Sequence, residues 1–272
     1  MFLRLGFAAL VASVWACEDT ALFVQPEVDA GFPEDADAPD ADEPDMGIAD
    51  TGALPPAPDP IYVHTGAILY SYDPETNTTT PVGAFRDDTG PVENMVDMAI
   101  DREGQMYGGT LEKKVVRIDP RTARVQPLFD FDDILHGMTF VSDGSLVIAG
   151  QRVTLVDPQS GRVNSELVPG SDWVTSGDVV GLPDGKLYWT VKGAGAGAPD
   201  DLVRIDPTTG DAARLGSAGV EKIFGLGYAR GSLYGFSSGG RVVVLDSTTG
   251  ASKEVRRLDG VWWGATTNPV RW

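Results

Sequence analysis

The chain has 272 residues, of which 42% are hydrophobic and 22% are charged, values typical of a globular protein that can bury a core. Its 21 basic residues against 40 acidic ones give a formal net charge of −19. Because an acidic surface repels phosphate groups, nucleic acids and anionic lipid surfaces are disfavoured as partners.

The N-terminus reads MFLRLGFAALVASVWAC, with an apolar run too short to anchor the chain across a bilayer. It predicts a signal peptide over residues 1–16. The ending VWAC resembles the lipobox of bacterial lipoproteins, in which the cysteine becomes the lipidated first residue. This resemblance implies lipidation of Cys17 and an extracytoplasmic protein anchored to a membrane, at the periplasmic face or the cell surface. The alternatives are an ordinary secretory signal with an unrelated cysteine, or a reduced cysteine in the core.

Residues 17–60 have the composition of a disordered segment. Between Glu18 and Pro60 there are thirteen acidic residues, eight prolines and no lysine or arginine. Such a segment cannot bury enough apolar surface to fold, and its charges repel one another. The sequence therefore predicts a disordered, extended acidic tether that joins Cys17 to a folded domain at 61–272.

One short phrase occurs five times in that domain. Its copies are YDPETN, IDPRTA, VDPQSG, IDPTTG and LDSTTG, with the Asp at positions 73, 119, 157, 206 and 246. The spacings between these positions, 46, 38, 49 and 40 residues, are typical of a propeller array. Because proline fixes φ and glycine accepts a positive φ, the phrase predicts a turn between two strands rather than a binding site.

Each copy is preceded by two apolar strands around a glycine-containing turn and by a third strand, and is followed by a weaker fourth strand. The domain opens at IYVHTGAILYSYDPETNTTTPVGAF, which lacks the first strand of a repeat, and ends with VWWGATTNPVRW, which matches that missing strand. We therefore predict an all-β fold: a five-bladed β-propeller of four-stranded antiparallel blades, closed by the N- and C-terminal strands.

The phrases G-L-x-x-x-x-x-G-x-L-Y and x-D-P-x-T-G resemble the repeats of secreted bacterial β-propellers related to the NHL, YVTN and gluconolactonase-like repeats. The resemblance covers residues 61–272 and implies the fold, but no single activity. It also implies that the ligand face is formed by the loops from strand four to the next strand one and from strand two to strand three. The irregular loops of the first kind are 86–94, 130–134, 170–176, 217–222 and 258–263.

Alignment of the first strands puts one residue of each repeat near the axis, and these residues are Asp97, Gly137, Asp178, Gly225 and Gly264. The preceding positions include His136 and Trp263. The candidate ligand-binding residues at the channel mouth are therefore Asp97, His136, Asp178, Trp262 and Trp263.

Three hypotheses compete for this cluster. Asp97 and Asp178, with a loop acid such as Asp132 or Asp133, could bind a hard cation such as Ca²⁺ through oxygen ligands. The same carboxylates could accept hydrogen bonds from a sugar that stacks on tryptophan. Alternatively, they are the solvated polar lining of a water-filled channel.

Catalytic patterns are incomplete. A gluconolactonase-like site implies a metal-binding Glu early in the propeller with Asn and Asp from later blades; Glu93, Asn94 and Asp97 suit the first part, but later blades offer only Asp178. The arabinanase-like glycosidases imply three inner carboxylates, and two are present. We assign no catalytic residue and expect a non-catalytic binding or scaffolding module for an envelope protein or glycan. The alternative is a metal-dependent hydrolase or lactonase that uses Asp97, His136 and Asp178.

Overall fold

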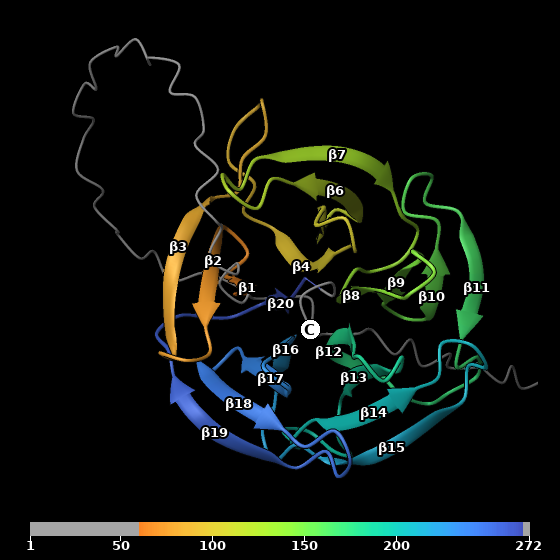
Figure 1. Ribbon diagram of the computed structural model, residues 1–272. Coiled ribbons are helices and arrows are strands. Elements are labelled where there is room, and N and C mark those ends of the chain that lie inside the picture. The colour runs from red at the N-terminus through yellow and green to blue at the C-terminus, as the bar shows by residue number, and fades with distance from the viewer. Residues whose placement is uncertain (1–59, 269–272) are drawn as a thin grey trace, which may run out of the picture. The chain divides into compact units, whose positions relative to one another are not determined.

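Five four-stranded antiparallel sheets form a ring in the computed structural model, which describes residues 60–268 (Figure 1). The predicted all-β, five-bladed β-propeller is confirmed. The predicted signal peptide, Cys17 and most of the tether lie outside the described residues. Within residues 60–268, no helix has the length and apolar character needed to cross a bilayer.

Blade 1 joins the two ends of the described chain. Its strands follow the order β20-β1-β2-β3 and span Gly264–Thr266, Ile61–His64, Ile68–Asp73 and Thr78–Ala84. The innermost strand, β20, pairs antiparallel with β1 so that Tyr62 lies opposite Thr266 and His64 opposite Gly264. The predicted closure of the ring by strands from both termini is confirmed.

The other four blades each consist of four consecutive strands, the first of them innermost and the last outermost. Blade 2 has β4 (Met95–Ile100), β5 (Met106–Thr110), β6 (Lys114–Ile118) and β7 (Val125–Asp130). Blade 3 has β8 (Gly137–Phe140), β9 (Leu146–Ala149), β10 (Val153–Val156) and β11 (Val163–Leu167). Blade 4 has β12 (Thr175–Gly181), β13 (Leu187–Val191), β14 (Asp201–Ile205) and β15 (Ala212–Ser217). Blade 5 has β16 (Ile223–Ala229), β17 (Ser232–Ser237), β18 (Arg241–Leu245) and β19 (Ser252–Arg257).

The repeated aspartate phrase forms the turn between the third and fourth strands of every blade. In each copy a carboxylate oxygen of the Asp accepts the N–H group two residues later, as Asp119 does from Arg121 at 2.8 Å. The last residue of the phrase has a positive φ in all five blades, at Asn77, Ala123, Gly161, Gly210 and Gly250. The prediction that the phrase is a turn is confirmed.

Removing one of these turn carboxylates is expected to destabilise its blade slightly. Asp119→Ala removes the acceptor for the Arg121 N–H group and the Thr122 hydroxyl, so we expect a loss of about 1 kcal/mol. Urea unfolding followed by circular dichroism measures this loss. Asp119→Asn keeps one acceptor oxygen and should lose less; an equal loss in both variants would contradict the role of the side-chain hydrogen bonds.

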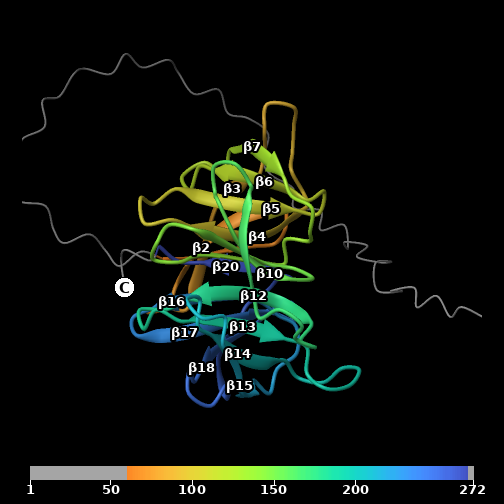
Figure 2. The same cartoon turned by 90° about the vertical axis from the view of Figure 1, so that its right-hand side faces the viewer.

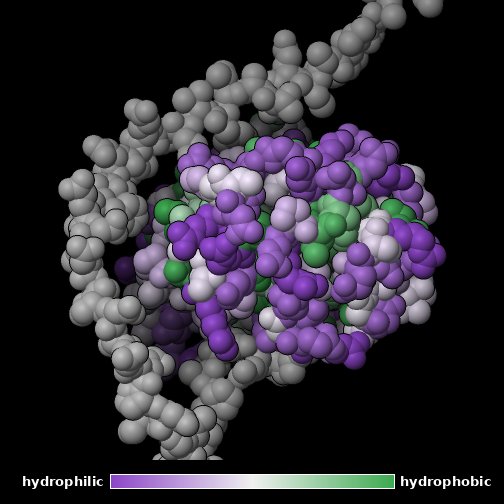
Figure 3. Space-filling model, turned by 90° about the horizontal axis from the view of Figure 1, so that it is seen from above, coloured by the Kyte–Doolittle hydropathy of each residue, from purple (hydrophilic) through white to green (hydrophobic). Residues whose placement is uncertain are grey.

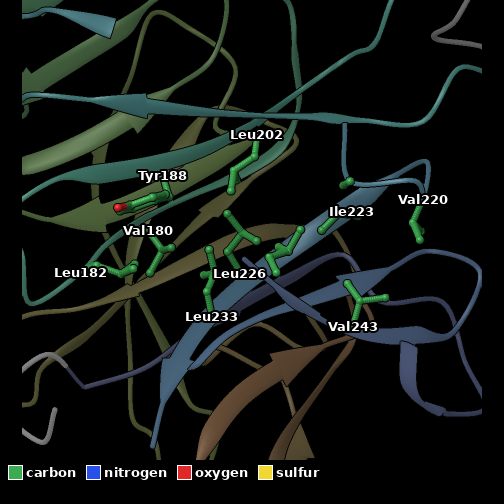
Figure 4. Packing of buried hydrophobic residues seen from close by; sticks show 11 residues of the cluster. Val180, Leu182, Tyr188, Leu202, Val220, Ile223, Leu226, Leu233 and Val243 are labelled. Atoms are coloured by element: carbon green, nitrogen blue, oxygen red, sulfur yellow. The ribbon is translucent and has the colours of Figure 1, made fainter. Parts of the chain in front are cut away.

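The core lies between the blades rather than inside any one of them. Neighbouring sheets pack face to face (Figure 2), and each of the five buried apolar clusters combines side chains from two adjacent blades. In the cluster shown in Figure 4, Val180 and Tyr188 of blade 4 pack with Leu226 and Leu233 of blade 5. The outermost strands are mostly exposed, and the side of the ring in Figure 3 is mainly hydrophilic.

Candidate functional site

Glycines on the innermost strands allow the blades to approach closely around the axis. A Cβ on Gly137 of β8 would lie 2.9 Å from the Val179 nitrogen of β12, and a Cβ on Gly225 of β16 would lie 2.8 Å from the Ala265 nitrogen of β20. Contacts this short do not occur for real Cβ atoms, so a side chain at either position would force the strands apart. The close approach of the blades near the axis therefore requires glycine at these two positions.

Irregular strand register accompanies both axial aspartates. The pairing of β4 with β5 shifts between Met95 and Asp97, and the pairing of β12 with β13 shifts between Thr175 and Val179, on either side of Asp178. A bulge of this kind changes the direction of a side chain relative to a regular strand. Neither aspartate has any exposed surface. The hypothesis that they are the solvated lining of a channel is therefore wrong for these two side chains.

Asp97 and Asp178 link the innermost strands of successive blades. Asp97 Oδ2 accepts the Met138 N–H group of blade 3 at 2.6 Å, and Asp178 Oδ2 accepts the Leu226 N–H group of blade 5 at 2.5 Å. Asp178 Oδ1 also accepts the Val179 N–H group at 2.6 Å. The carboxyl groups of Asp97 and Asp178 lie close enough to each other to influence one another's pKa. If one of them is protonated, it can donate a hydrogen bond to the other, and the pair can share that proton.

The surroundings of this pair favour its protonated form. Burial raises the pKa of Asp97 well above its usual value, and the charge of Asp178 raises it further. Burial also raises the pKa of Asp178 well above its usual value, although hydrogen bonds from Asp97 and from main-chain N–H groups oppose the effect. The pair therefore holds a proton at pH values where an exposed aspartate is ionised.

His64, at the end of β1, is a third fully buried titratable residue near this pair. Burial lowers the pKa of its imidazole to about 3, so the ring is neutral at physiological pH. A Cβ on Gly264 would lie within 2.5 Å of both Asp97 Oδ1 and His64 Nε2, which places the two polar atoms beside the same glycine. Our sequence interpretation omitted His64 from the candidate residues. The signal that could have identified His64 is its place in the strand that pairs with the strand containing Gly264.

The other predicted site residues lie closer to the loops. His136, immediately before β8, is partly buried, and its pKa is lowered by burial and by Lys192, against the effect of Asp133. Trp262 is 2% exposed and packs edge-on against Tyr70 with ring centroids 5.4 Å apart, so its ring faces the core. Trp263 is partly exposed, and its main-chain N–H group bonds the His64 carbonyl at 2.9 Å.

The loop acids considered as cation ligands have different surroundings. Asp132 is exposed. Asp133 is buried and accepts N–H groups from Ile134, Gln151 and Arg152 at 2.7 to 3.2 Å, which fixes the loop before β8 against the loop between β9 and β10. Within residues 60–268, no three His, Cys, Asp or Glu side chains are grouped so that they could hold a metal ion.

Three exposed apolar side chains lie on the face predicted to bind a ligand. Leu111 lies between β5 and β6, Val174 directly precedes β12, and Val261 lies shortly before β20. These side chains are 58%, 55% and 40% exposed. The five large apolar residues that are exposed among residues 60–268 also include two on outermost strands, Val163 and Val255. We call Leu111, Val174 and Val261 the apolar loop residues.

A groove of about 630 Å³ lies on the opposite face, between blades 4 and 5. It is lined by the turn after β12, by the turn after β16 and by the aspartate phrase of blade 5, including Asp184, Tyr228 and Lys253. The groove does not lie on the loop face, because these turns connect the other ends of the strands. The residues that line the groove belong to turns that recur from blade to blade, so the repeat itself explains why they are there.

The fold defines this chain as a five-bladed β-propeller. No family model matches the chain, and no curated protein matches it. Among solved structures, a crystal structure of a protein of unknown function from Bacteroides caccae is similar, with a TM-score of 0.44 and 14% sequence identity. The match covers 74% of this chain and 73% of that chain. The resemblance to the NHL, YVTN and gluconolactonase-like repeats stays a prediction.

Proposed function

We propose that this propeller is a non-catalytic binding module that docks a protein partner on its loop face at the cell envelope. The observation that carries the proposal is the position of the apolar loop residues, all three of which lie on the face where the innermost strands begin. Exposed apolar side chains are common on monomers when they are scattered, but several on one loop face favour a partner surface.

A protein fits this face better than a glycan does. Leu111, Val174 and Val261 are aliphatic, and aliphatic side chains gain free energy by burying apolar surface against a protein. Sugar recognition instead uses exposed aromatic rings as stacking platforms, and the ring of Trp262 is almost completely buried. Trp263 and Phe224, which are partly exposed beside the axis, would extend the apolar contact.

The surroundings of the axial aspartates support a non-catalytic role. A metal-dependent hydrolase or lactonase that uses Asp97, His136 and Asp178 needs carboxyl oxygens that a metal ion or substrate can reach. Asp97 and Asp178 have no exposed surface, and three of their four oxygens accept main-chain N–H groups. Their hydrogen bonds to main-chain N–H groups of the next blade indicate that these two aspartates hold neighbouring blades together.

Attachment to the envelope is the part of the proposal that rests on the sequence. The lipobox-like VWAC ending supports lipidation of Cys17, and the thirteen acidic residues that follow support an extended spacer between the membrane and the propeller. On this basis the protein is an extracytoplasmic lipoprotein whose contact with the membrane is made by its lipid.

The test compares two sets of serine substitutions in the full-length protein. Leu111→Ser/Val174→Ser/Val261→Ser is expected to lose at least tenfold in partner capture from an envelope extract, measured by quantitative mass spectrometry. Val163→Ser/Val255→Ser changes side chains of similar exposure on outermost strands and should capture the partner like the unchanged protein. Equal capture by both variants would contradict the proposal, and so would binding to a glycan array with no loss in the triple variant.

A further inference from the structure

The groove between blades 4 and 5, on the face opposite the loop face, contains a turn that is shorter than its counterparts. In blades 2, 3 and 4, five residues connect the paired ends of the first and second strands, and these are 101–105, 141–145 and 182–186. In blade 5 the strands pair as far as Ala229 with Ser232, which leaves only residues 230–231 in the turn. The longer turn of blade 4 therefore faces a shorter one, and the space beside it is part of the groove.

The aspartate phrase of blade 5 also departs from the other four copies. It has Ser247 where they have proline, at positions 74, 120, 158 and 207. A serine adds a hydroxyl and a main-chain N–H group that proline cannot supply. Ser247 is partly buried and lines the groove. Two departures from the repeat therefore occur at one place, where the architecture of the propeller does not require them.

Apolar side chains form the base of this groove. Leu182, Leu233 and Leu245 line it and belong to the buried cluster between the two blades, in which Figure 4 shows Leu182 and Leu233. Tyr228 packs against the same cluster and is partly exposed in the groove. The volume of about 630 Å³ lies within the range of about 300–1,000 Å³ that is typical of ligand sites. The base of the groove can therefore cover apolar groups of a ligand.

Both blades contribute a carboxylate to the groove. Asp184 lies in the turn of blade 4, where its Oδ1 accepts the Lys186 N–H group at 2.9 Å and its Oδ2 accepts the Tyr188 hydroxyl at 2.8 Å. Asp246 lies in the aspartate phrase of blade 5. A carboxylate can accept about four hydrogen bonds, so both groups can still accept from a ligand. Of the charged side chains that line the groove, two are acidic and one, Lys253, is basic, so the groove is net negative.

We propose that this groove binds a short peptide segment of a partner, in which a lysine or arginine lies beside apolar side chains. The base of the groove covers the apolar side chains, and Asp184 and Asp246 pair with the cationic group. Ser247 hydrogen-bonds the main chain of the segment. A peptide fits because it offers these three kinds of group together, whereas the negative charge of the groove disfavours anionic ligands. The site is not on the loop face, so this proposal does not depend on the function proposed above.

Short synthetic peptides test the proposal with the full-length protein. Each peptide has a central lysine, arginine, glutamine or glutamate flanked either by leucine or by glycine, and its dissociation constant is measured by fluorescence anisotropy. Because the groove is net negative and has an apolar base, the lysine and arginine peptides with leucine should bind about tenfold more tightly than the matching glutamate peptides. Replacement of leucine by glycine should also weaken binding.

Two pairs of variants locate the site. Asp184→Asn removes the charge but keeps an acceptor for the Tyr188 hydroxyl, and Ser247→Pro introduces the residue of the other four phrases. Each variant should weaken binding of the lysine peptide about tenfold and leave the melting temperature unchanged. Asp143→Asn alters the matching turn of blade 3, and Pro120→Ser alters the matching phrase of blade 2. Both of these controls should bind the peptide like the unchanged protein.

The apolar loop residues provide the last comparison. The triple serine variant of these residues should bind the lysine peptide like the unchanged protein, because its substitutions are on the other face. If that variant loses the peptide while Asp184→Asn and Ser247→Pro retain it, the peptide binds to the loop face, so the groove proposal fails and the function proposed above stands. Equal binding of the lysine and glutamate peptides, or no binding of either, would also overturn the groove proposal.

Discussion

Removal of residues 261–272 is expected to abolish cooperative folding of the propeller. The deletion removes β20, and with it the only partner of β1 on the axial side of blade 1 in the described sheet. It also removes Trp262, which is 2% exposed in the cluster between blades 5 and 1. Loss of one buried tryptophan costs about 3–5 kcal/mol, and small domains have total stabilities of about 5–15 kcal/mol. Because β20 is lost as well, the remaining interactions provide too little stabilising free energy to hold the ring together.

Differential scanning calorimetry checks this expectation, with limited proteolysis as a second measurement. The truncated chain should show no cooperative transition and should be digested rapidly. A shorter deletion of residues 269–272 leaves β20 in place and serves as the control, with a transition like that of the unchanged protein. If both truncated chains melt at the same temperature as the full chain, the strand pairing between β1 and β20 does not hold the ring closed.

The second large effect is expected from Asp97→Asn, and it concerns the dependence of stability on pH. The pKa values of Asp97 and Asp178 are raised in the folded protein because both groups are buried, so the folded pair keeps a proton that the unfolded chain releases above about pH 4. The folded state then binds more protons than the unfolded state, and stability falls as pH rises. The fall continues until the pH reaches the raised pKa of the folded pair.

Asp97→Asn should remove this dependence while preserving the contacts. The amide has the shape of a protonated carboxyl group: its oxygen can accept the Met138 N–H group, and its nitrogen can donate to Asp178. In the unchanged protein, the free energy of unfolding should fall by about 1.4 kcal/mol per pH unit for the shared proton. The variant should lack that contribution and become the more stable protein at pH 9. Urea unfolding at pH 5, 7 and 9 measures both slopes.

Two further variants make this experiment decisive. Asp133→Asn alters a different buried aspartate that accepts main-chain N–H groups and leaves Asp97 and Asp178 in place, so the fall in stability that this pair causes should remain. Asp97→Ala leaves the Met138 N–H group without its acceptor and Asp178 without its donor, and should cost about 3–5 kcal/mol. Parallel pH profiles for the unchanged protein and Asp97→Asn would show that the two carboxyls share no proton at neutral pH.

The features that repeat were predictable from the sequence. The aspartate phrase sets a turn by local chemistry, since Asp119 bonds a main-chain N–H group two residues away, and five copies reveal the number of blades. Closure was predictable because the first repeat lacked a strand and the last residues supplied one. Gly137, Gly225 and Gly264 fell in register because each first strand occupies the same place in its blade.

The chemistry of the axial cluster was harder to predict because it depends on contacts between repeats. Asp97 and Asp178 are 81 positions apart in the chain, and the bulges that accompany them shift register in a way no local pattern indicates. His64 belongs to an incomplete repeat, so alignment of the first strands did not include it. The sequence alone does not show whether an aspartate is buried: Asp97 is fully buried, whereas Asp132 is exposed.

The pairing of β20 with β1 has a consequence for how the protein is made. A ribosome releases the first strands of blade 1 long before it releases Gly264–Thr266, so β1 must wait until the strands of blades 2 to 5 have been synthesised. Blades 2 to 5 consist of consecutive segments and can form in the order of synthesis. Contacts between such distant segments form slowly. The nascent chain thus stays an open arc until Gly264–Thr266 has been synthesised, and only then can blade 1 close the ring.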